Sequence, residues 1–180
     1  MPASTLPDRF APLLDAVGDL LPLAAAPPDP TSDRVGELAG DGRSLILHDL
    51  TEKVVEYESN NPDPTGGTPT EEDFATVRLE IFGPGGEPLG HTAGAGRMLY
   101  RRPEDGHFIA YFGEEIRLLD GNVIRAGGLV DDARLTAGEA AGFPAVVVAG
   151  PLRGAIGFRQ FRPVGEAHGT YESSIVVYRN

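Results

Sequence analysis

The side chains with the clearest chemical potential lie in two short segments, HFIAYFGEEI and GFRQFRP. Side chains alternate between the two faces of a β-strand, so Phe112 and Glu114 share one face of the first segment. Arg159 and Phe161 share one face of the second segment in the same way. An inward guanidinium could donate hydrogen bonds inside the protein, although an outward arginine is the ordinary case in a strand. Alternation alone leaves open which face is inside.

Two pairs of adjacent acids invite comparison with acid–base pairs. Asp131 and Asp132 are neighbours in the sequence, as are Glu114 and Glu115. Neighbouring residues of a strand point to opposite faces, so neither pair can act as general acid and general base on one substrate. Any member that points inward is of interest, because a buried carboxylate requires a partner.

The residue patterns of the commoner catalytic sites are missing. The chain has no cysteine, which excludes disulfides, thiolate catalysis and cysteine-ligated metal sites. No G-x-S-x-G segment marks a serine nucleophile, and the GAG at 94–96 lacks the lysine and glycine spacing of a phosphate loop. We therefore expect neither a bound metal nor a cofactor. Four histidines do not have the spacing of metal ligands: His48, His91, His107 and His168.

From residue 44 onward the pattern is that of short strands separated by turns. Turn segments such as NNPDPTGG, GPGGEP, LDGN and PVGEAHG are rich in Gly, Pro, Asp and Asn. The first strand segment reads as two strands or as one long bent strand, and only 135–142 has helical character. The expected strands are 44–58, 74–82, 88–101, 107–119, 122–135, 143–149, 155–162 and 171–179.

These strands favour an all-β fold, an eight-stranded antiparallel β-barrel. The first and last strands contain KVVEYES and SSIVVYR, which are apolar enough to need partner strands. Closure into a barrel removes the exposed edges that promote aggregation. Gly94, Gly96, Gly127 and Gly128 fit bends where the sheet coils. About eight strands leave room inside for one small ligand when the lining residues are not all large.

The first 42 residues differ from the barrel domain, which we place at residues 43–180. Apolar residues recur at helical spacing between Phe10 and Leu21, and residues 25–42 have the Pro, Asp and Gly content of a linker. We therefore expect an N-terminal helix and linker over residues 1–42. The helix braces the barrel from outside, pairs with a second copy, or forms a lid over one mouth.

The net charge of −12 argues against binding to nucleic acid or to an anionic membrane, because either partner requires a basic face. No apolar run approaches the roughly 20 residues of a transmembrane helix. The first residues lack the basic and apolar stretches of a signal peptide, so we expect a cytoplasmic protein.

Several motifs of the barrel segment follow one another in a fixed order. A G-x-x-x-G strand leads to RMLYRRPEDG, and YFGEEIRL, DGNVIRAGG, FPA and GFRQFRP follow. In this set of motifs, over about residues 75–165, the chain resembles the allene-oxide-cyclase-like barrel proteins of actinomycete polyketide clusters. Within these it is most similar to the [4+2] cyclases, or Diels–Alderases, of spirotetronate and spirotetramate biosynthesis.

The resemblance implies a hollow barrel, usually a homodimer, that works without metal or cofactor. Its implied substrate is a hydrophobic linear polyene that carries a tetronate or tetramate ring and undergoes [4+2] cyclisation inside the barrel. Phe112 stands where some relatives have tyrosine, and Phe161 stands where tryptophan is expected. The resemblance also selects the face of Arg159 and Phe161 as interior. The positions that correspond to the pocket lining are Phe112, Asp132, Phe143, Arg159 and Phe161.

An intramolecular cycloaddition moves no proton and forms no covalent intermediate, which agrees with the missing nucleophiles. An apolar cavity can hold the diene and the dienophile in near-attack geometry. We expect Arg159 to donate a hydrogen bond to the carbonyl that activates the dienophile, with Tyr111 or Tyr57 as substitutes. Glu114 and Asp132 would orient the arginine or bind substrate hydroxyls. Arg159→Ala should then slow cyclisation without disturbing the fold.

Two alternatives remain open. The same barrel could perform another cyclisation, of ether-ring or allene-oxide type, in which a buried Glu114 or Asp132 transfers a proton. It could also be a non-catalytic barrel, either a lipocalin-like binder or a dirigent-like template. A binder retains its ligand unchanged, whereas a cyclase converts it to an isomer of equal mass.

Overall fold

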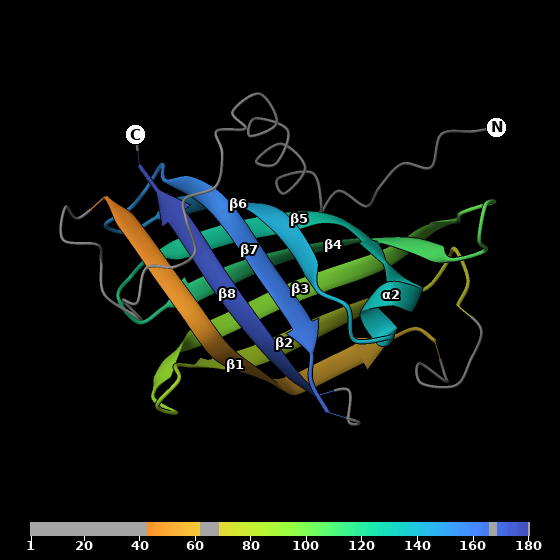
Figure 1. Ribbon diagram of the computed structural model, residues 1–180, viewed down its shortest axis with the longest axis horizontal. Coiled ribbons are helices and arrows are strands. Elements are labelled where there is room, and N and C mark those ends of the chain that lie inside the picture. The colour runs from red at the N-terminus through yellow and green to blue at the C-terminus, as the bar shows by residue number, and fades with distance from the viewer. Residues whose placement is uncertain (1–42, 62–68, 166–168, 180) are drawn as a thin grey trace.

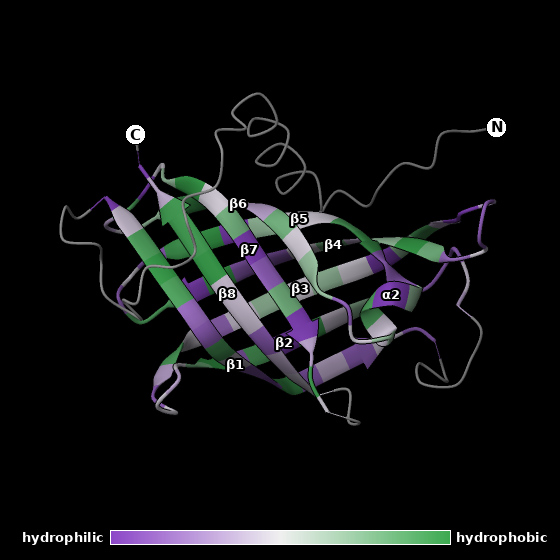
Figure 2. Ribbon diagram, in the orientation of Figure 1, coloured by the Kyte–Doolittle hydropathy of each residue, from purple (hydrophilic) through white to green (hydrophobic). Residues whose placement is uncertain are grey.

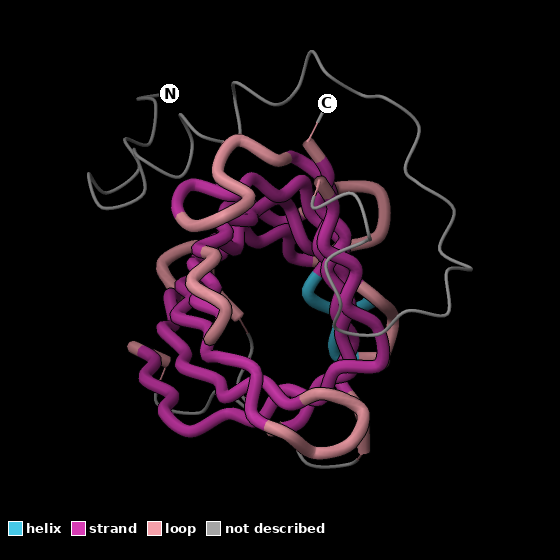
Figure 3. Tube along the Cα trace, turned by 90° about the vertical axis from the view of Figure 1, so that its left-hand side faces the viewer, coloured by secondary structure: helices cyan, strands magenta, loops and turns pink. Residues whose placement is uncertain are grey.

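The protein is described by a computed structural model over residues 43–61, 69–165 and 169–179. The helix and linker expected over residues 1–42 lie outside the described residues. Eight strands form one closed antiparallel sheet, in which each strand pairs with the next and β8 pairs with β1 (Figures 1 and 3). The strands are β1 (Ser44–Ser59), β2 (Phe74–Phe82), β3 (Pro88–Arg101), β4 (Phe108–Leu118), β5 (Val123–Asp131), β6 (Ala141–Ala149), β7 (Ile156–Pro163) and β8 (Thr170–Tyr178).

Closure of the barrel depends on the pairing of β1 with β8, the two strands whose apolar sequences predict that they need partner strands. Ser44 of β1 lies opposite Tyr178 of β8, and the pairing continues to Lys53 opposite Thr170. Each of the eight strands therefore has a neighbour on both sides, although the second half of β5, from Gly127 to Asp131, pairs with β4 and not with β6. The predicted eight-stranded antiparallel barrel is confirmed.

β1 is one long bent strand rather than two strands. Its register with β8 shifts between Leu47 and Leu50, where Asp49 has a φ of 52°. Its register with β2 shifts between Val54 and Glu56. Such irregularities bend a strand and increase its twist. β1 can therefore follow the curved wall of the barrel over 16 residues.

β5 is shorter than the sequence predicts. It ends at Asp131 instead of continuing to residue 135, and α2 (Asp132–Thr136) follows. The Asp131 carboxylate accepts a hydrogen bond from the backbone N–H of Arg134 and so caps the helix. The strand prediction is wrong here because this cap starts a helical turn, and helix also begins before the 135–142 stretch expected for it. No helix in the described part of the chain is long and apolar enough to span a bilayer.

The interior of the barrel divides into a solid half and a hollow half. Toward the start of β1 and the end of β8, aliphatic side chains pack into a core that includes Leu47, Ile116, Ile124 and Val177. Hydrophilic and hydrophobic residues succeed one another along the strands, as Figure 2 shows. Toward the opposite end, beside α2, the inward side chains surround a cavity.

Glycines of β3 and β5 make room for aromatic rings. A Cβ atom at Gly94 would lie 2.6 Å from Cζ of Phe112, and one at Gly128 would lie 2.7 Å from Cδ1 of Phe143. Gly96 lies beside the ring of Phe112 as well. These positions do more than bend the sheet, because each ring rests directly on the backbone of a neighbouring strand.

Candidate active site

A cavity of about 470 Å³ occupies the hollow half of the barrel. This volume is typical of pockets that hold one small organic molecule. Its walls come from the second half of β1, the first half of β2, the second half of β3, the first part of β4, the end of β5, α2, β7 and the start of β8. The aliphatic core closes the barrel on the other side, so the cavity is a blind pocket that opens toward the α2 end.

Aromatic rings form one wall of this cavity. Phe112 of β4 and Phe161 of β7 line it, with ring centroids 5.9 Å apart. Tyr171 of β8 continues the wall, edge-on to Phe161 at 5.8 Å. Phe143 is fully buried behind both phenylalanines, at 6.1 and 5.6 Å from their centroids. Because the rings support one another, the wall is a fixed apolar surface.

Three charged side chains meet at the floor of the cavity. Arg159 Nη2 lies 2.7 Å from Oε1 of Glu52, and Arg159 Nε donates to Oε1 of Glu114 at 3.0 Å. All three side chains are 1% exposed. The Ser173 hydroxyl donates to Glu52 at 2.5 Å, and Arg159 Nη1 donates to the carbonyl of Gln160. The structure thus places the guanidinium inside the barrel, where two carboxylates hold it.

The strands place this cluster at the boundary between core and cavity. Glu52 follows the core residue Leu50 by two positions, and Glu114 precedes the core residue Ile116 by two. Removing Arg159 would leave both carboxylates buried without a cation, which is strongly destabilising. The expectation that Arg159→Ala leaves the fold undisturbed is therefore replaced by an expected loss of stability.

Burial changes the protonation of Glu114. Removal from water raises its pKa, the charge of Arg159 lowers it, and the charge of Glu52 raises it again, to a final pKa of about 7. Near neutral pH, Glu114 is therefore present both as the carboxylate and as the carboxylic acid. Such a group can donate or accept a proton or a hydrogen bond.

Asp132 and Tyr57 line the cavity nearer its mouth. Asp132 is the first residue of α2, and burial together with the adjacent charge of Asp131 raises its pKa. Tyr57 is 53% exposed, so its phenol is available to a ligand only at the opening.

Two of the predicted site residues lie outside the cavity. Phe143 supports the aromatic wall from behind and does not line it. Tyr111 lies between Ala110 and Phe112, which both line the cavity, so its ring is on the outer face of β4. Its hydroxyl lies against Gly127 of β5. Tyr111 therefore cannot replace Arg159 as a donor to a ligand in the cavity. The predicted residues that do surround the cavity are Tyr57, Phe112, Glu114, Asp132, Arg159 and Phe161.

The sequence patterns do not predict three members of the site. Tyr171 and Ser173 lie in an apolar strand without any motif, and Glu52 lies in β1, where the bulge near Asp49 reverses the alternation. The available signal was an acidic residue two positions after the apolar Leu50, on the same face of the strand.

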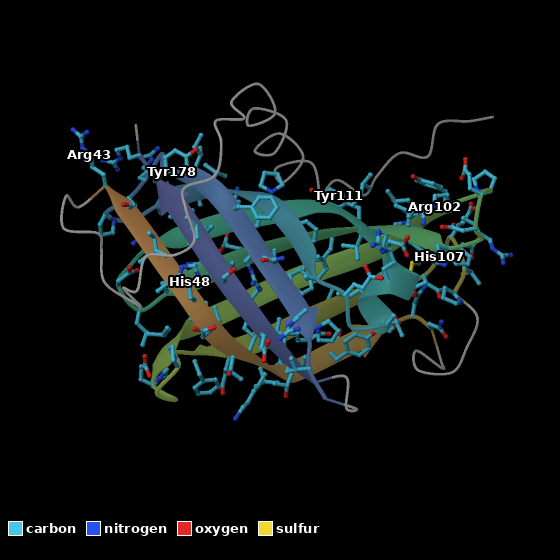
Figure 4. All side chains as sticks on the ribbon, viewed as in Figure 1. Arg43, His48, Arg102, His107, Tyr111 and Tyr178 are labelled. Atoms are coloured by element: carbon cyan, nitrogen blue, oxygen red, sulfur yellow. The ribbon has the colours of Figure 1, made fainter. Side chains whose placement is uncertain are left out.

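A second charged cluster lies outside the barrel beside α2 (Figure 4). Arg102 binds Asp105 and donates to Asp131 at 2.5 Å, and His107 Nδ1 lies 3.0 Å from Asp131. The donor atoms of the two aspartates and the histidine are close enough for a shared metal ion. Arg102 already occupies both carboxylates, so we interpret the cluster as a brace between the β3–β4 turn and α2.

Three solved structures resemble this chain over most of its length. AbnU, an exo-specific intermolecular Diels–Alderase, is 25% identical, with a TM-score of 0.68 over 76% of this chain and 97% of that chain. A nonspecific heme-binding cyclase that catalyses [4+2] cycloaddition during neoabyssomicin biosynthesis is 28% identical, with a TM-score of 0.70 over 100% of this chain and 83% of its own. The Diels–Alderase AbmU from Streptomyces koyangensis is 28% identical, with a TM-score of 0.70 over 99% and 76% of the two chains.

The sequence was also compared with individual curated proteins and with models of protein families. None of the curated proteins is significantly similar to this chain. The model of the allene oxide cyclase barrel-like domain matches residues 53–177, from the middle of β1 to the end of β8. This match covers most of the chain and the whole aromatic wall, and it agrees with the closed barrel. The chain therefore belongs to the allene oxide cyclase barrel-like family.

Proposed function

We propose that this protein catalyses an intramolecular [4+2] cycloaddition, a Diels–Alder cyclisation, without a metal or cofactor. The proposed substrate is a linear hydrophobic polyene that carries a tetronate or tetramate ring. The observation that carries the proposal is the blind cavity of about 470 Å³, with its aromatic wall and charged floor. The likeness to AbnU and AbmU supports the reaction type.

A cavity of this kind can accelerate a cycloaddition by holding the substrate in a folded conformation. Two carbon–carbon σ bonds form as two π bonds are lost, and no proton leaves or enters the substrate. Bringing the diene and the dienophile together therefore accounts for much of the barrier. Positioning of this kind contributes up to about 7–11 kcal/mol in the most favourable intramolecular reactions. Phe112 and Phe161 supply the apolar surface against which the polyene would fold.

Conversion of a linear polyene tetronate to an isomer of equal mass, followed by liquid chromatography and mass spectrometry, tests the proposal. Phe161→Ala opens the aromatic wall and should lower the rate by about tenfold to a hundredfold. Phe158→Ala removes an outward, 46% exposed ring from the same strand and should leave the rate unchanged. Recovery of bound but unconverted polyene would instead identify a binding protein.

A cyclisation with proton transfer, such as ether-ring formation, is a second candidate function. The observation that favours it is Glu114, because this chemistry requires a buried carboxylate beside the substrate and Glu114 is 1% exposed. The nuclear magnetic resonance spectrum of the product separates the two reactions. A new cyclohexene ring supports cycloaddition, and a new carbon–oxygen bond supports ether formation.

We further expect the protein to form a homodimer and to act in the cytoplasm. Light scattering on the eluting peak of a size-exclusion column should give a mass of twice that of one chain.

A further inference from the structure

The charges at the floor of the cavity do not balance. Glu52 and Glu114 are both carboxylates, and Arg159 is the single guanidinium between them. All three side chains are 1% exposed, so water does not compensate the additional negative charge. A buried carboxylate without its own cation is strongly disfavoured and responds by taking up a proton.

Among the residues that the structure describes, the surroundings of Glu114 provide no second cation. Its partners across the sheet are Gly94 on β3 and Ala126 on β5, and neither carries a charge. Arg97 borders the cavity farther toward the mouth, but it lies opposite Tyr111, whose ring is on the outer face. The other titratable residues that the described cavity wall presents are phenols and carboxylates: Tyr57, Tyr171, Asp73 and Asp132.

Hydrogen bonding decides which of the two glutamates takes the proton. Glu52 accepts from both Arg159 and the Ser173 hydroxyl, at 2.7 and 2.5 Å. Among the described residues, Glu114 accepts from Arg159 alone, at 3.0 Å. Donors stabilise the ionised form of a carboxylate, so Glu52 keeps its charge and Glu114 carries the proton. The elevated pKa of Glu114, which burial causes, agrees with this order.

The guanidinium of Arg159 is largely committed to the protein. Its Nε donates to Glu114, its Nη2 to Glu52, and its Nη1 to the carbonyl of Gln160 at 2.7 Å. Its central carbon lies 5.2 Å from the ring centroid of Phe161. All three nitrogen atoms therefore have a protein acceptor, whereas Glu114 lines the cavity with one oxygen that no described residue bonds.

We propose that Glu114, as a neutral carboxylic acid, is the catalytic residue that donates a hydrogen bond to an uncharged carbonyl oxygen of the substrate. Arg159 is a positioning residue that holds Glu114. The hydrogen bond strengthens as the carbonyl conjugated to the dienophile gains negative charge in the transition state. The O–H bond of Glu114 stays intact while the two carbon–carbon bonds form. This inference rests on the proposed cycloaddition, and it specifies that an uncharged carbonyl of the substrate, rather than an ionised enolate oxygen of its tetronate or tetramate ring, lies beside Glu114, because an anion would add a second negative charge beside Glu52.

The pH dependence of kcat/KM for the full-length protein, measured on the linear polyene between about pH 5 and pH 9, tests this assignment. Wild-type kcat/KM should fall by about tenfold per pH unit above the pKa of Glu114, because only the acid donates. Glu114→Gln keeps a donor that cannot ionise, so its activity should not change with pH. Glu114→Met has no donor and should lose about a hundredfold or more at every pH. Arg159→Lys keeps the cation but loses the Nε donor, which should move the wild-type fall in activity to higher pH.

An infrared measurement tests the proton without turnover. The carbonyl stretch of a protonated carboxylic acid should be present in the wild-type spectrum near pH 6 and absent in Glu114→Gln. A Glu114→Met variant as active as the wild type, a wild-type profile that stays flat, or a band that persists in Glu114→Gln would each overturn the assignment. A wild-type protein that never forms the isomer overturns the proposed cycloaddition itself, and the assignment with it.

Discussion

Two clusters in this protein share one composition, an arginine between two carboxylates, in opposite surroundings. The inner cluster lies at the floor of the cavity, and its side chains are 1% exposed. The outer cluster lies beside α2, and its arginine is 33% exposed. The members of the inner cluster are Glu52, Arg159 and Glu114. The members of the outer cluster are Arg102, Asp105 and Asp131.

The two clusters shift the protonation of their carboxylates in opposite directions. In the outer cluster, the hydrogen bond from Arg102 holds the pKa of Asp105 well below its usual range, against a smaller opposing effect of burial. In the inner cluster, burial raises the pKa of Glu114 despite the adjacent charge of Arg159. Access of water, rather than the number of charges, thus determines whether a carboxylate beside an arginine can carry a proton.

The largest difference in stability between the clusters should come from replacing each arginine by methionine. Arg159→Met leaves buried carboxylates without a cation and should lower the free energy of unfolding by about 3–5 kcal/mol. Arg102→Met leaves Asp105 accessible to water and Asp131 beside His107, so it should lower the free energy of unfolding much less. Urea unfolding followed by circular dichroism measures both. Adding Glu52→Gln and Glu114→Gln to Arg159→Met should restore much of the stability, and equal losses in the two single variants would contradict the contrast.

The pH dependence of stability should have opposite signs in the two clusters. Glu114 has a pKa of about 7 in the folded protein, above the ordinary value of 4.5 for a glutamate, so the folded state keeps a proton that the unfolded state loses. Wild-type stability relative to Glu114→Gln should therefore fall as pH rises from about 4.5 to about 7, by about 3 kcal/mol in total. Above about pH 7, the difference in stability between the wild type and Glu114→Gln should be constant.

Asp105 provides the control for this measurement. Its pKa in the folded protein lies below the ordinary value of 3.8 for an aspartate, so its stabilising effect is present above that pH and is lost as the pH falls through the folded pKa. Wild-type stability relative to Asp105→Asn should decrease toward acid, over a range in which Glu114 contributes no slope. If both stability differences, that of the wild type from Glu114→Gln and that from Asp105→Asn, changed with pH in the same direction, the assignment of the proton to the inner cluster would be contradicted.

Removal of the hydroxyl that supports Glu52 should have the smallest of these effects. Ser173→Ala deletes a donor to a buried carboxylate and should cost about 1–3 kcal/mol. Ser174→Ala changes the next residue of β8, on the outward face, and should be nearly neutral. Thermal unfolding of the two variants gives the comparison, and an undiminished stability of Ser173→Ala would show that this hydrogen bond to Glu52 does not stabilise the fold.

Most of the fold follows from local signals in the sequence. Turn residues and alternating side chains are enough to predict eight strands, and the need for partner strands at both ends predicts closure. Two features depend on more than alternation. The bulge near Asp49 requires the curvature of the closed sheet, and the early end of β5 requires the cap that Asp131 supplies to α2.

The site is harder to predict because its contacts join distant strands. Motifs were sufficient to select Arg159 and Phe161 as inward residues, but not to find that Glu52, 107 positions earlier, pairs with the arginine. The bulge in β1 moves this glutamate to the inner face. The regular alternation of side chains along a strand does not predict such a shift. Tyr111 shows the reverse case. The motif predicts it as a hydrogen-bond donor to the substrate, but its ring lies on the outer face of β4, away from the cavity.

The rings of Phe112 and Phe143 lie directly on glycine backbone, and this arrangement bears on how such a barrel diversifies. One added methyl group at Gly94 would push the ring of Phe112 toward the cavity, and one at Gly128 would displace Phe143 behind it. Neither substitution replaces a charged residue of the floor. Single substitutions in the wall can therefore resize the space offered to a polyene while the reaction centre stays as it is. Substrate length and chemistry are then free to evolve separately.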